Sequence, residues 1–156
     1  MISRFASPGD DYLRRIGELA YAVSSLEWTV LGDLYRLRAC VPDSLTAGHL
    51  AGQTTGTIAS RLLDASKRIS EAEVAAFIRA GGEALSEAAT LRNAVLHARP
   101  ATIDDEQRLY RWRLGSKPEA FAISDEWLDN TLLTIAKLSH SVDAARLSFD
   151  DYPHPG

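Results

Sequence analysis

Three side chains that could act together on a phosphate group lie within a six-residue stretch: Arg92, Asn93 and His97. Asn93 and His97 are four residues apart and therefore share one face of a helix. Arg92 lies about 100° around the helix axis from Asn93, and its side chain is long enough to reach the same space. An imidazole can transfer protons near neutral pH, and a guanidinium donates paired hydrogen bonds to phosphate oxygens. The stretch therefore predicts a catalytic site made of these three residues.

Arg92 also occupies a position that should face the core of a helix bundle. Apolar residues recur every three or four positions on both sides of it, and Glu27 interrupts a similar series between Val23 and Val30. An isolated buried charge costs several kcal/mol, so each side chain needs a partner. We expect Glu27 to support Arg92 across the bundle. Two alternatives are that Arg92 faces a polar cleft that binds an anion, or that the pair only fixes the register of the helices.

Four main helices are predicted to carry these residues. The first follows the N-cap Ser7, has Pro8 at its first position and ends at Val41. A loop or short helix is expected over residues 43–56. The other helices are expected near 54–68, from a Ser70–Glu73 capping box to Arg99, and after the N-cap Ser124.

Residues 101–123 are predicted to form a β-hairpin. The first strand alternates apolar residues with arginines: Tyr110, Arg111, Trp112, Arg113 and Leu114. Alternation puts rings and charges on opposite faces, so we favour rings packed on the bundle and arginines in water. Such a strand could also contact an RNA backbone and stack on bases, with Arg99, Arg111 and Arg113 as the contacts.

These elements together predict an all-α fold. We expect a four- to five-helix up-and-down bundle, with a small β-hairpin inserted before the last helix. A single domain is expected over residues 1–149, followed by a flexible C-terminal tail over residues 150–156.

The composition is that of a globular protein. The 156 residues are 46% hydrophobic and 24% charged, unlike collagen, a disordered chain or a small disulfide scaffold. No stretch approaches the roughly 20 apolar residues of a membrane helix, and the N-terminus lacks the apolar core of a signal peptide. The single cysteine, Cys40, fits a reducing cytoplasm. A net charge of −4 argues against a wholly basic nucleic-acid binder, although a local basic patch can still bind phosphate.

The histidines do not predict a metal site. They are far apart in the sequence, at His49, His97, His140 and His154, and none has a neighbouring ligand at metal-binding spacing. We therefore expect neither a metal nor another cofactor.

The stretch Arg92-Asn93-Ala94-Val95-Leu96-His97 resembles the Arg-(four to six residues)-His signature of HEPN-domain proteins, in its form with Asn after the Arg. Those proteins are α-helical bundles, and many are metal-independent ribonucleases of toxin–antitoxin and other defence systems. The resemblance implies an endoribonuclease that cleaves RNA through its 2′-hydroxyl and leaves a 2′,3′-cyclic phosphate. His97 would be the acid or base, Arg92 would bind the phosphate with help from Asn93, and Glu27 would hold Arg92.

The resemblance also implies a homodimer in which motif residues of both protomers line one cleft. A second apolar series on the first helix fits such an interface; its members are Tyr21, Trp28, Leu31 and Tyr35. An antitoxin or a regulatory protein is a further partner that the resemblance suggests, and no membrane partner is expected.

The chain departs from the family at one position. In toxins whose antitoxin is a nucleotidyltransferase, a Tyr commonly stands two residues after the His and accepts a nucleotide, whereas this chain has Arg99 there. We therefore do not expect that modification. The alternative to a ribonuclease is a non-catalytic HEPN-like bundle that binds RNA, a nucleotide or a protein.

Overall fold

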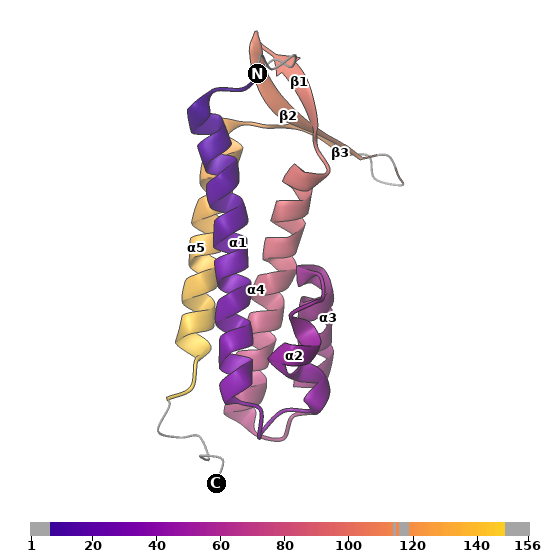
Figure 1. Cartoon of the computed structure of the whole chain (residues 1–156), viewed down its shortest axis with the longest axis vertical. Helices are drawn as coiled ribbons and strands as arrows, with labels where there is room; N and C mark the ends of the chain where they lie inside the picture. Colours follow the sequence, from indigo (N-terminus) through magenta and orange to yellow (C-terminus); the bar gives the residue numbers. More distant parts are fainter. Residues whose placement is uncertain (1–6, 114, 116–118, 149–156) are drawn as a thin grey trace.

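The structure, a computed structural model, describes residues 7–113, 115 and 119–148, and most of them are helical (Figure 1). The elements are α1 (Asp10–Arg36), a 3₁₀ turn (Asp43–Leu45), α2 (Ala47–Leu50), α3 (Thr55–Ser66), α4 (Ala72–Leu96), β1 (Arg99–Ile103), β2 (Glu106–Arg113), β3 (Glu119–Ile123) and α5 (Asp125–Ala145). The long helices α1, α4 and α5 lie side by side, α2 and α3 cover one half of their length, and the sheet lies at the other end. None of the described helices combines the length and apolarity that crossing a membrane requires. The tail expected over 150–156 lies outside the described residues.

The core lies between α1, α3, α4 and α5. Its fully buried side chains come from all four helices and include Val23, Val30, Ile58, Leu62, Phe77, Leu85 and Leu128. Burying one such side chain contributes roughly 1.5–3 kcal/mol. The contact between α3 and α4 is especially close at Gly82, where a Cβ atom would lie 2.8 Å from Leu63 Cγ and 3.1 Å from the Leu63 backbone nitrogen. The apolar period of each helix therefore faces its neighbours, and small residues set the spacing.

Helix α1 is shorter than its sequence predicts. It begins at Asp10 with Gly9 as its N-cap, so Ser7 is not the capping residue. At the other end the backbone N–H of Cys40 bonds to the carbonyl of Leu37, which turns the chain out of the helix. This turn buries both Leu37 and Val41, and the gain in apolar burial explains why the helix stops before Val41.

The start of α4 also differs, whereas the start of α5 is as predicted. Ser70 donates to the carboxylate of its neighbour Glu71 rather than forming a capping box, and α4 begins at Ala72. Ser124 does cap α5, because its Oγ accepts from the backbone N–H of Trp127 at 3.1 Å.

The segment before α5 is a three-stranded antiparallel sheet in the order β1-β2-β3, not a hairpin. The additional strand β1 pairs with β2 from Arg99↔Tyr110 to Ile103↔Glu106. Asp104 and Asp105 close this pair with φ angles of 50° and 63°, the left-handed conformation that a tight two-residue turn needs. Because β1 is an edge strand, it tolerates Pro100, which cannot donate a backbone hydrogen bond.

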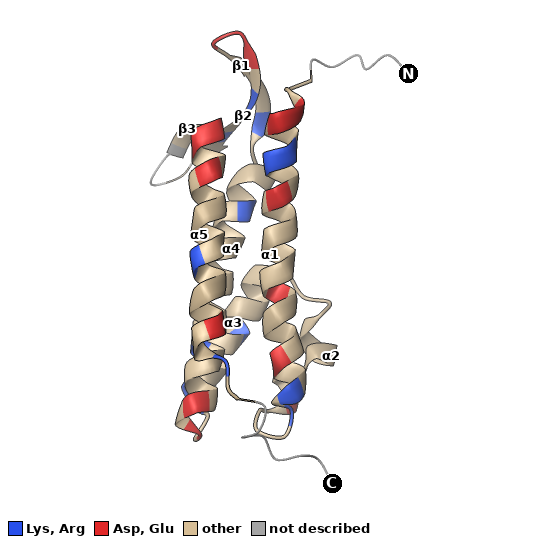
Figure 2. Cartoon of the chain, turned by 90° about the vertical axis from the view of Figure 1, so that its left-hand side faces the viewer, with Lys and Arg blue, Asp and Glu red and all other residues tan. Residues whose placement is uncertain are grey.

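Tyr12 joins α1 to the sheet. Its buried hydroxyl donates to the carbonyl of Ile123 at 2.7 Å and accepts from the N–H of Leu109 at 2.9 Å. Arg15 of α1 binds Asp129 of α5 at 2.7 Å. Figure 2 shows several charged residues near the upper ends of these two helices. The Tyr12 contacts hold the sheet over the end of the bundle, where α4 also ends.

Candidate functional site

Arg92 of α4 and Glu27 of α1 meet at the N-terminal end of α3. The hydroxyl of Thr55 accepts a hydrogen bond from Arg92 Nη1 at 2.9 Å and donates one to Glu27 Oε2 at 2.5 Å. The two charged groups are thus linked by a neutral group rather than by direct contact. Sequence reasoning did not single out Thr55, although it precedes Ile58 by three residues and shares its buried face.

Arg92 keeps unused hydrogen-bonding capacity. Its Nε atom is buried and has no partner, and in the described part of the chain Thr55 is its only hydrogen-bond partner. A guanidinium has five N–H donors, and the Arg92 side chain is partly exposed. Among the described residues, the group is therefore held in place by Thr55 without a carboxylate in contact with it.

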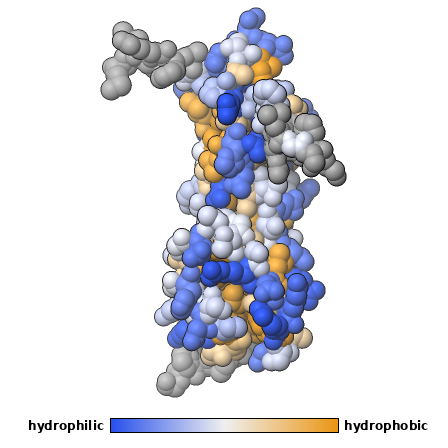
Figure 3. All heavy atoms as spheres, turned by 90° about the vertical axis from the view of Figure 1, so that its right-hand side faces the viewer, coloured by the Kyte–Doolittle hydropathy of each residue, from blue (hydrophilic) through white to orange (hydrophobic). Residues whose placement is uncertain are grey.

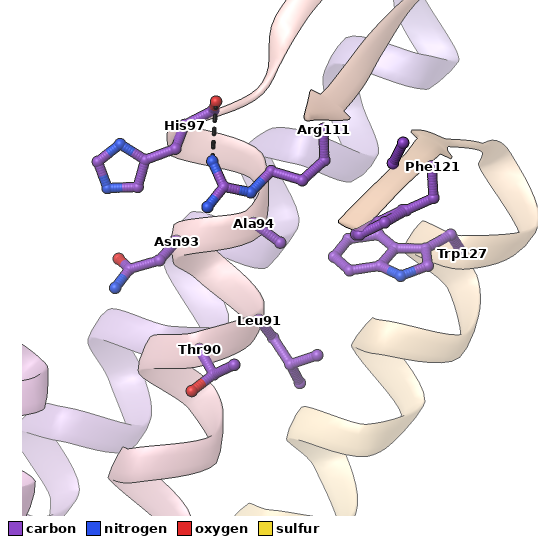
Figure 4. Close-up of a pocket in the computed structure, with 9 residues that line it drawn as sticks. Thr90, Leu91, Asn93, Ala94, His97, Arg111, Phe121 and Trp127 are labelled. Atoms are coloured by element: carbon purple, nitrogen blue, oxygen red, sulfur yellow. Dashed lines mark hydrogen bonds between the residues drawn. The ribbon is translucent and has the colours of Figure 1, made fainter. Parts of the chain in front are cut away.

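Asn93 and His97 line a hollow at the C-terminal end of α4 (Figure 4). The hollow has a volume of about 670 Å³ and is lined by Thr90, Leu91, Asn93, Ala94, His97, Arg111, Ala120, Phe121 and Trp127. Both polar side chains extend from the same side of α4, as their spacing predicts, and both are exposed. No side-chain hydrogen bond joins them in the part of the chain that the structure describes.

Arg92 does not line this hollow. Its guanidinium turns toward α3, because Thr55 binds it there, while His97 lies five residues later and about 140° around the helix. The expectation that Arg92 reaches the same space as Asn93 and His97 is therefore wrong within one chain. The candidate residues therefore form two groups. Arg92 is partly buried against α3, whereas His97 and Asn93 are exposed at the hollow.

Arg111 closes the end of α4. His97 is the C-cap residue, and its carbonyl accepts a hydrogen bond from Arg111 Nη1 at 3.0 Å. Cations are favoured at this end of a helix, where backbone carbonyls lack partners. The last turn of α4 has no basic residue of its own, so the sheet supplies one.

On β2 the arginine faces the bundle and the tryptophan faces solvent, which is the reverse of the arrangement that the sequence pattern favoured. Trp112 is 65% exposed, whereas Arg111 extends across the end of α4. Arg111 lies directly opposite Phe121 on β3, and the Phe121 ring packs against Trp127 with centroids 5.9 Å apart. The carbonyls at the helix end explain this, because they lack intrahelical donors and the Arg111 guanidinium supplies one.

The remaining basic residues expected to contact RNA are more dispersed. Arg99 is exposed on β1, and the side chain of Arg113 lies outside the described residues. Seen from the side of α3, the surface is mainly hydrophilic with smaller apolar areas between (Figure 3).

In the described residues, no group of three or more His, Cys, Asp or Glu side chains is placed to hold a metal ion. Comparisons of the chain with protein-family models, with curated proteins and with solved structures find no match.

Proposed function

We propose that this protein is a metal-independent endoribonuclease of the HEPN type that acts as a homodimer. The observation that carries the proposal is the state of Arg92. The residue is partly exposed, its Nη1 donates to a neutral hydroxyl, and its buried Nε has no partner among the described residues. It precedes an exposed imidazole, that of His97, by five residues. An arginine that served only the fold would be expected to pair directly with a carboxylate.

The proposed reaction needs a proton acceptor and a cation. His97 removes the proton from the 2′-hydroxyl of RNA, the 2′-oxygen bonds to phosphorus, and the bond from phosphorus to the 5′-oxygen breaks. The His97 imidazolium then gives its proton to the leaving 5′-oxygen. One RNA product therefore ends in a 5′-hydroxyl, and the other ends in a 2′,3′-cyclic phosphate. Arg92 stabilises the negative charge that grows on the phosphate oxygens. Thr55 and Glu27 act as positioning residues for Arg92, and Asn93 contacts the ribose or the phosphate.

A second copy of the chain would complete this site. Within one chain Arg92 and His97 face different sides of α4, so both can reach one phosphate only if His97 of another copy approaches Arg92. The proposal therefore requires an interface close to the edge of the bundle where Glu27 and Arg92 lie.

The outer face of α1 fits a contact with a second copy. Tyr21, Trp28 and Tyr35 are 78%, 68% and 60% exposed, and they recur every seven residues. Leu31, the fourth member of the series expected at the interface, is instead buried in the core of the chain. Between residues 19 and 35 the only charged residues are Glu27 and Asp33, and both turn inward, to Thr55 and Arg146. The Arg38 guanidinium lies 4.6 Å from the centroid of the Tyr35 ring, so the uncharged part of this surface surrounds Tyr21 and Trp28. A surface with three exposed rings is typical of a protein interface.

The same face is complementary to itself. Small residues alternate with the rings along α1, at Gly17, Ser25 and Gly32. An antiparallel second copy of α1 places Trp28 opposite Ser25 and Tyr21 opposite Gly32, so two of the three rings meet a small residue, and the third, Tyr35, lies opposite Glu18. Because Trp28 follows Glu27 in the chain, this contact lies next to the Glu27–Thr55–Arg92 network.

Cleavage of single-stranded RNA by the purified protein tests the proposal. The wild type should cut RNA without added metal, should not cut a strand with 2′-deoxy sugars, and should leave 2′,3′-cyclic phosphate ends. Arg92→Ala and His97→Ala should each lower the rate by about 10²- to 10⁴-fold. Arg79→Ala on α4 and His140→Ala on α5, both exposed, are matched controls that should keep the activity.

Circular dichroism checks that every variant folds. Cleavage that survives both Arg92→Ala and His97→Ala would show that the proposal is wrong. Salt-dependent RNA binding by a wild type that never cleaves would instead support the non-catalytic alternative.

A further inference from the structure

We propose that the hollow at the end of α4 binds one nucleotide, with its base against Phe121 and Trp127 and its phosphate at Arg111. The hollow would hold a nucleotide next to the one that is cut. In that respect the inference rests on the proposed ribonuclease activity, although the binding site can be tested without it.

The size and the two-sided character of the hollow fit a nucleotide. Its volume of about 670 Å³ lies within the range of about 300–1,000 Å³ that is usual for small-molecule sites. One side carries the polar Asn93 and His97, the other side carries Leu91 with the two aromatic rings, and Arg111 lies between them (Figure 4). A ligand that fills both sides needs a flat apolar part and a polar part.

The aromatic side provides a surface for stacking. Phe121 and Trp127 are both partly exposed, and their rings are inclined at 36° with centroids 5.9 Å apart. Such a pair offers the edge or face of a ring to an incoming base. Stacking of a base on an aromatic side chain contributes about 1–3 kcal/mol and depends little on which base it is.

Arg111 gives the hollow its charge. One of its terminal nitrogens binds the His97 carbonyl at 3.0 Å, and the planar guanidinium has further donors. None of the described residues that line the hollow is acidic. Arg111 is therefore held in a fixed position by one hydrogen bond while its other donors can bind phosphate oxygens.

These features favour a nucleotide over simpler ligands. A free anion would leave the aromatic side unused, and an apolar ligand would leave Arg111, Asn93 and His97 facing it without partners. The amide of Asn93 and the imidazole of His97 can both hydrogen-bond to a ribose or to the edge of a base.

Fluorescence of Trp127 provides the test. The double variant Trp28→Phe, Trp112→Phe keeps Trp127 as the only tryptophan. Adenosine 5′-monophosphate should quench its fluorescence in a saturable manner. Adenosine lacks the phosphate, and ribose 5-phosphate lacks the base. Each should bind with an affinity at least about tenfold lower than that of the monophosphate. Each titration is repeated by isothermal titration calorimetry, which measures the heat of binding and so also detects binding that does not quench the fluorescence.

Two substitutions separate the contributions of the phosphate and the base. Arg111→Gln should weaken binding of the monophosphate about tenfold and change adenosine little, whereas Phe121→Leu should weaken both. Arg79→Gln is the matched control on the exposed surface of α4 and should change neither. Thermal melting shows whether Arg111→Gln, which removes a contact at the end of α4, still folds.

Arg92→Ala distinguishes this inference from the proposed function. Arg92 lies outside the hollow, so the variant should lose RNA cleavage and still bind the monophosphate. If no titration shows saturable binding, or if ribose 5-phosphate binds as well as the monophosphate, the nucleotide site is wrong while the ribonuclease proposal stands. Binding of the monophosphate by a wild type that never cleaves RNA would support the site and overturn the ribonuclease.

Discussion

Glu27 and Arg92 lie on opposite sides of a single hydroxyl group. That group, on Thr55, accepts from Arg92 Nη1 at 2.9 Å and donates to Glu27 Oε2 at 2.5 Å. A hydroxyl has one proton and two lone pairs, so it can serve both partners at once. A direct contact would have bound the carboxylate to the guanidinium; here the hydroxyl orients Arg92, and the proposed function uses its charge to bind a phosphate group.

Removing this hydroxyl should reduce stability. Thr55→Val keeps the shape of the side chain but leaves the Glu27 carboxylate and the Arg92 guanidinium without their shared partner. We expect the free energy of unfolding to fall by about 1–3 kcal/mol, measured by urea denaturation. Thr55→Ser keeps the hydroxyl and is the matched control, with a loss of less than about 1.5 kcal/mol for the missing methyl group. Equal stability of Thr55→Val and the wild type would show that the bridge contributes nothing to folding.

Introducing a charge on the outer face of α1 should separate the proposed dimer. Trp28 is 68% exposed in the single chain, so Trp28→Asp should leave the fold intact and place a carboxylate in an apolar interface. Sedimentation equilibrium should show a dimer for the wild type and a monomer for the variant. Trp112→Asp, at a ring that is 65% exposed on the sheet, should remain dimeric. A wild type that is a monomer at all concentrations would contradict both the interface and the composite site.

Tyr12 should make the protein sensitive to alkaline pH. Burial raises the pKa of the Tyr12 phenol, although the Leu109 N–H and the charge of Arg108 act in the opposite direction. The native state then holds this proton more tightly than the unfolded state does. Its contribution to stability is complete below the ordinary tyrosine pKa of about 10 and is lost as the pH rises through the higher native value.

Urea unfolding at a series of alkaline pH values measures this effect. Tyr12→Phe should be less stable at neutral pH, because it loses the hydrogen bonds to Ile123 and Leu109, but its stability should fall less steeply above about pH 10. Tyr21→Phe changes an exposed ring and should keep the wild-type slope. Identical slopes for all three proteins would mean that Tyr12 is not the group that titrates.

The helices could be predicted from the sequence because their pattern is local. The apolar period of three and four residues places α1, α3, α4 and α5, and Ser124 fixes the start of α5 through a contact three residues away. The same spacing rule places Asn93 and His97 on one side of α4. Each of these inferences needs only residues that are neighbours along the chain.

Apart from the helix caps expected at Ser7 and Ser70, the errors concern contacts between distant segments. Strand β1 is an edge strand whose residues lack an apolar alternation, and only its pairing with β2 defines it. Arg111 faces inward because the carbonyl of His97 lies there, and Arg92 turns toward α3 because Thr55 lies there. A sequence pattern can show which residues share a face, but it cannot show which polar group from another element will meet that face.

The close contact between α3 and α4 should tolerate no methyl group at Gly82. A Cβ atom there would lie 2.8 Å from Leu63 Cγ and 3.1 Å from the Leu63 backbone nitrogen, so α3 would have to move. In a helix, alanine is more favourable than glycine by about 1 kcal/mol. Helix propensity alone would therefore predict that Gly82→Ala stabilises the protein. Overpacking costs about 1–3 kcal/mol or more, so we expect a net loss in the free energy of unfolding. Ser86→Ala, on the exposed surface of the next turn, is the control and should be neutral or slightly stabilising. Thr55 at the start of α3 holds Arg92 of α4, so a shift of α3 in Gly82→Ala should also lower the rate of RNA cleavage. A Gly82→Ala variant as stable as the wild type would contradict the close packing of α3 on α4.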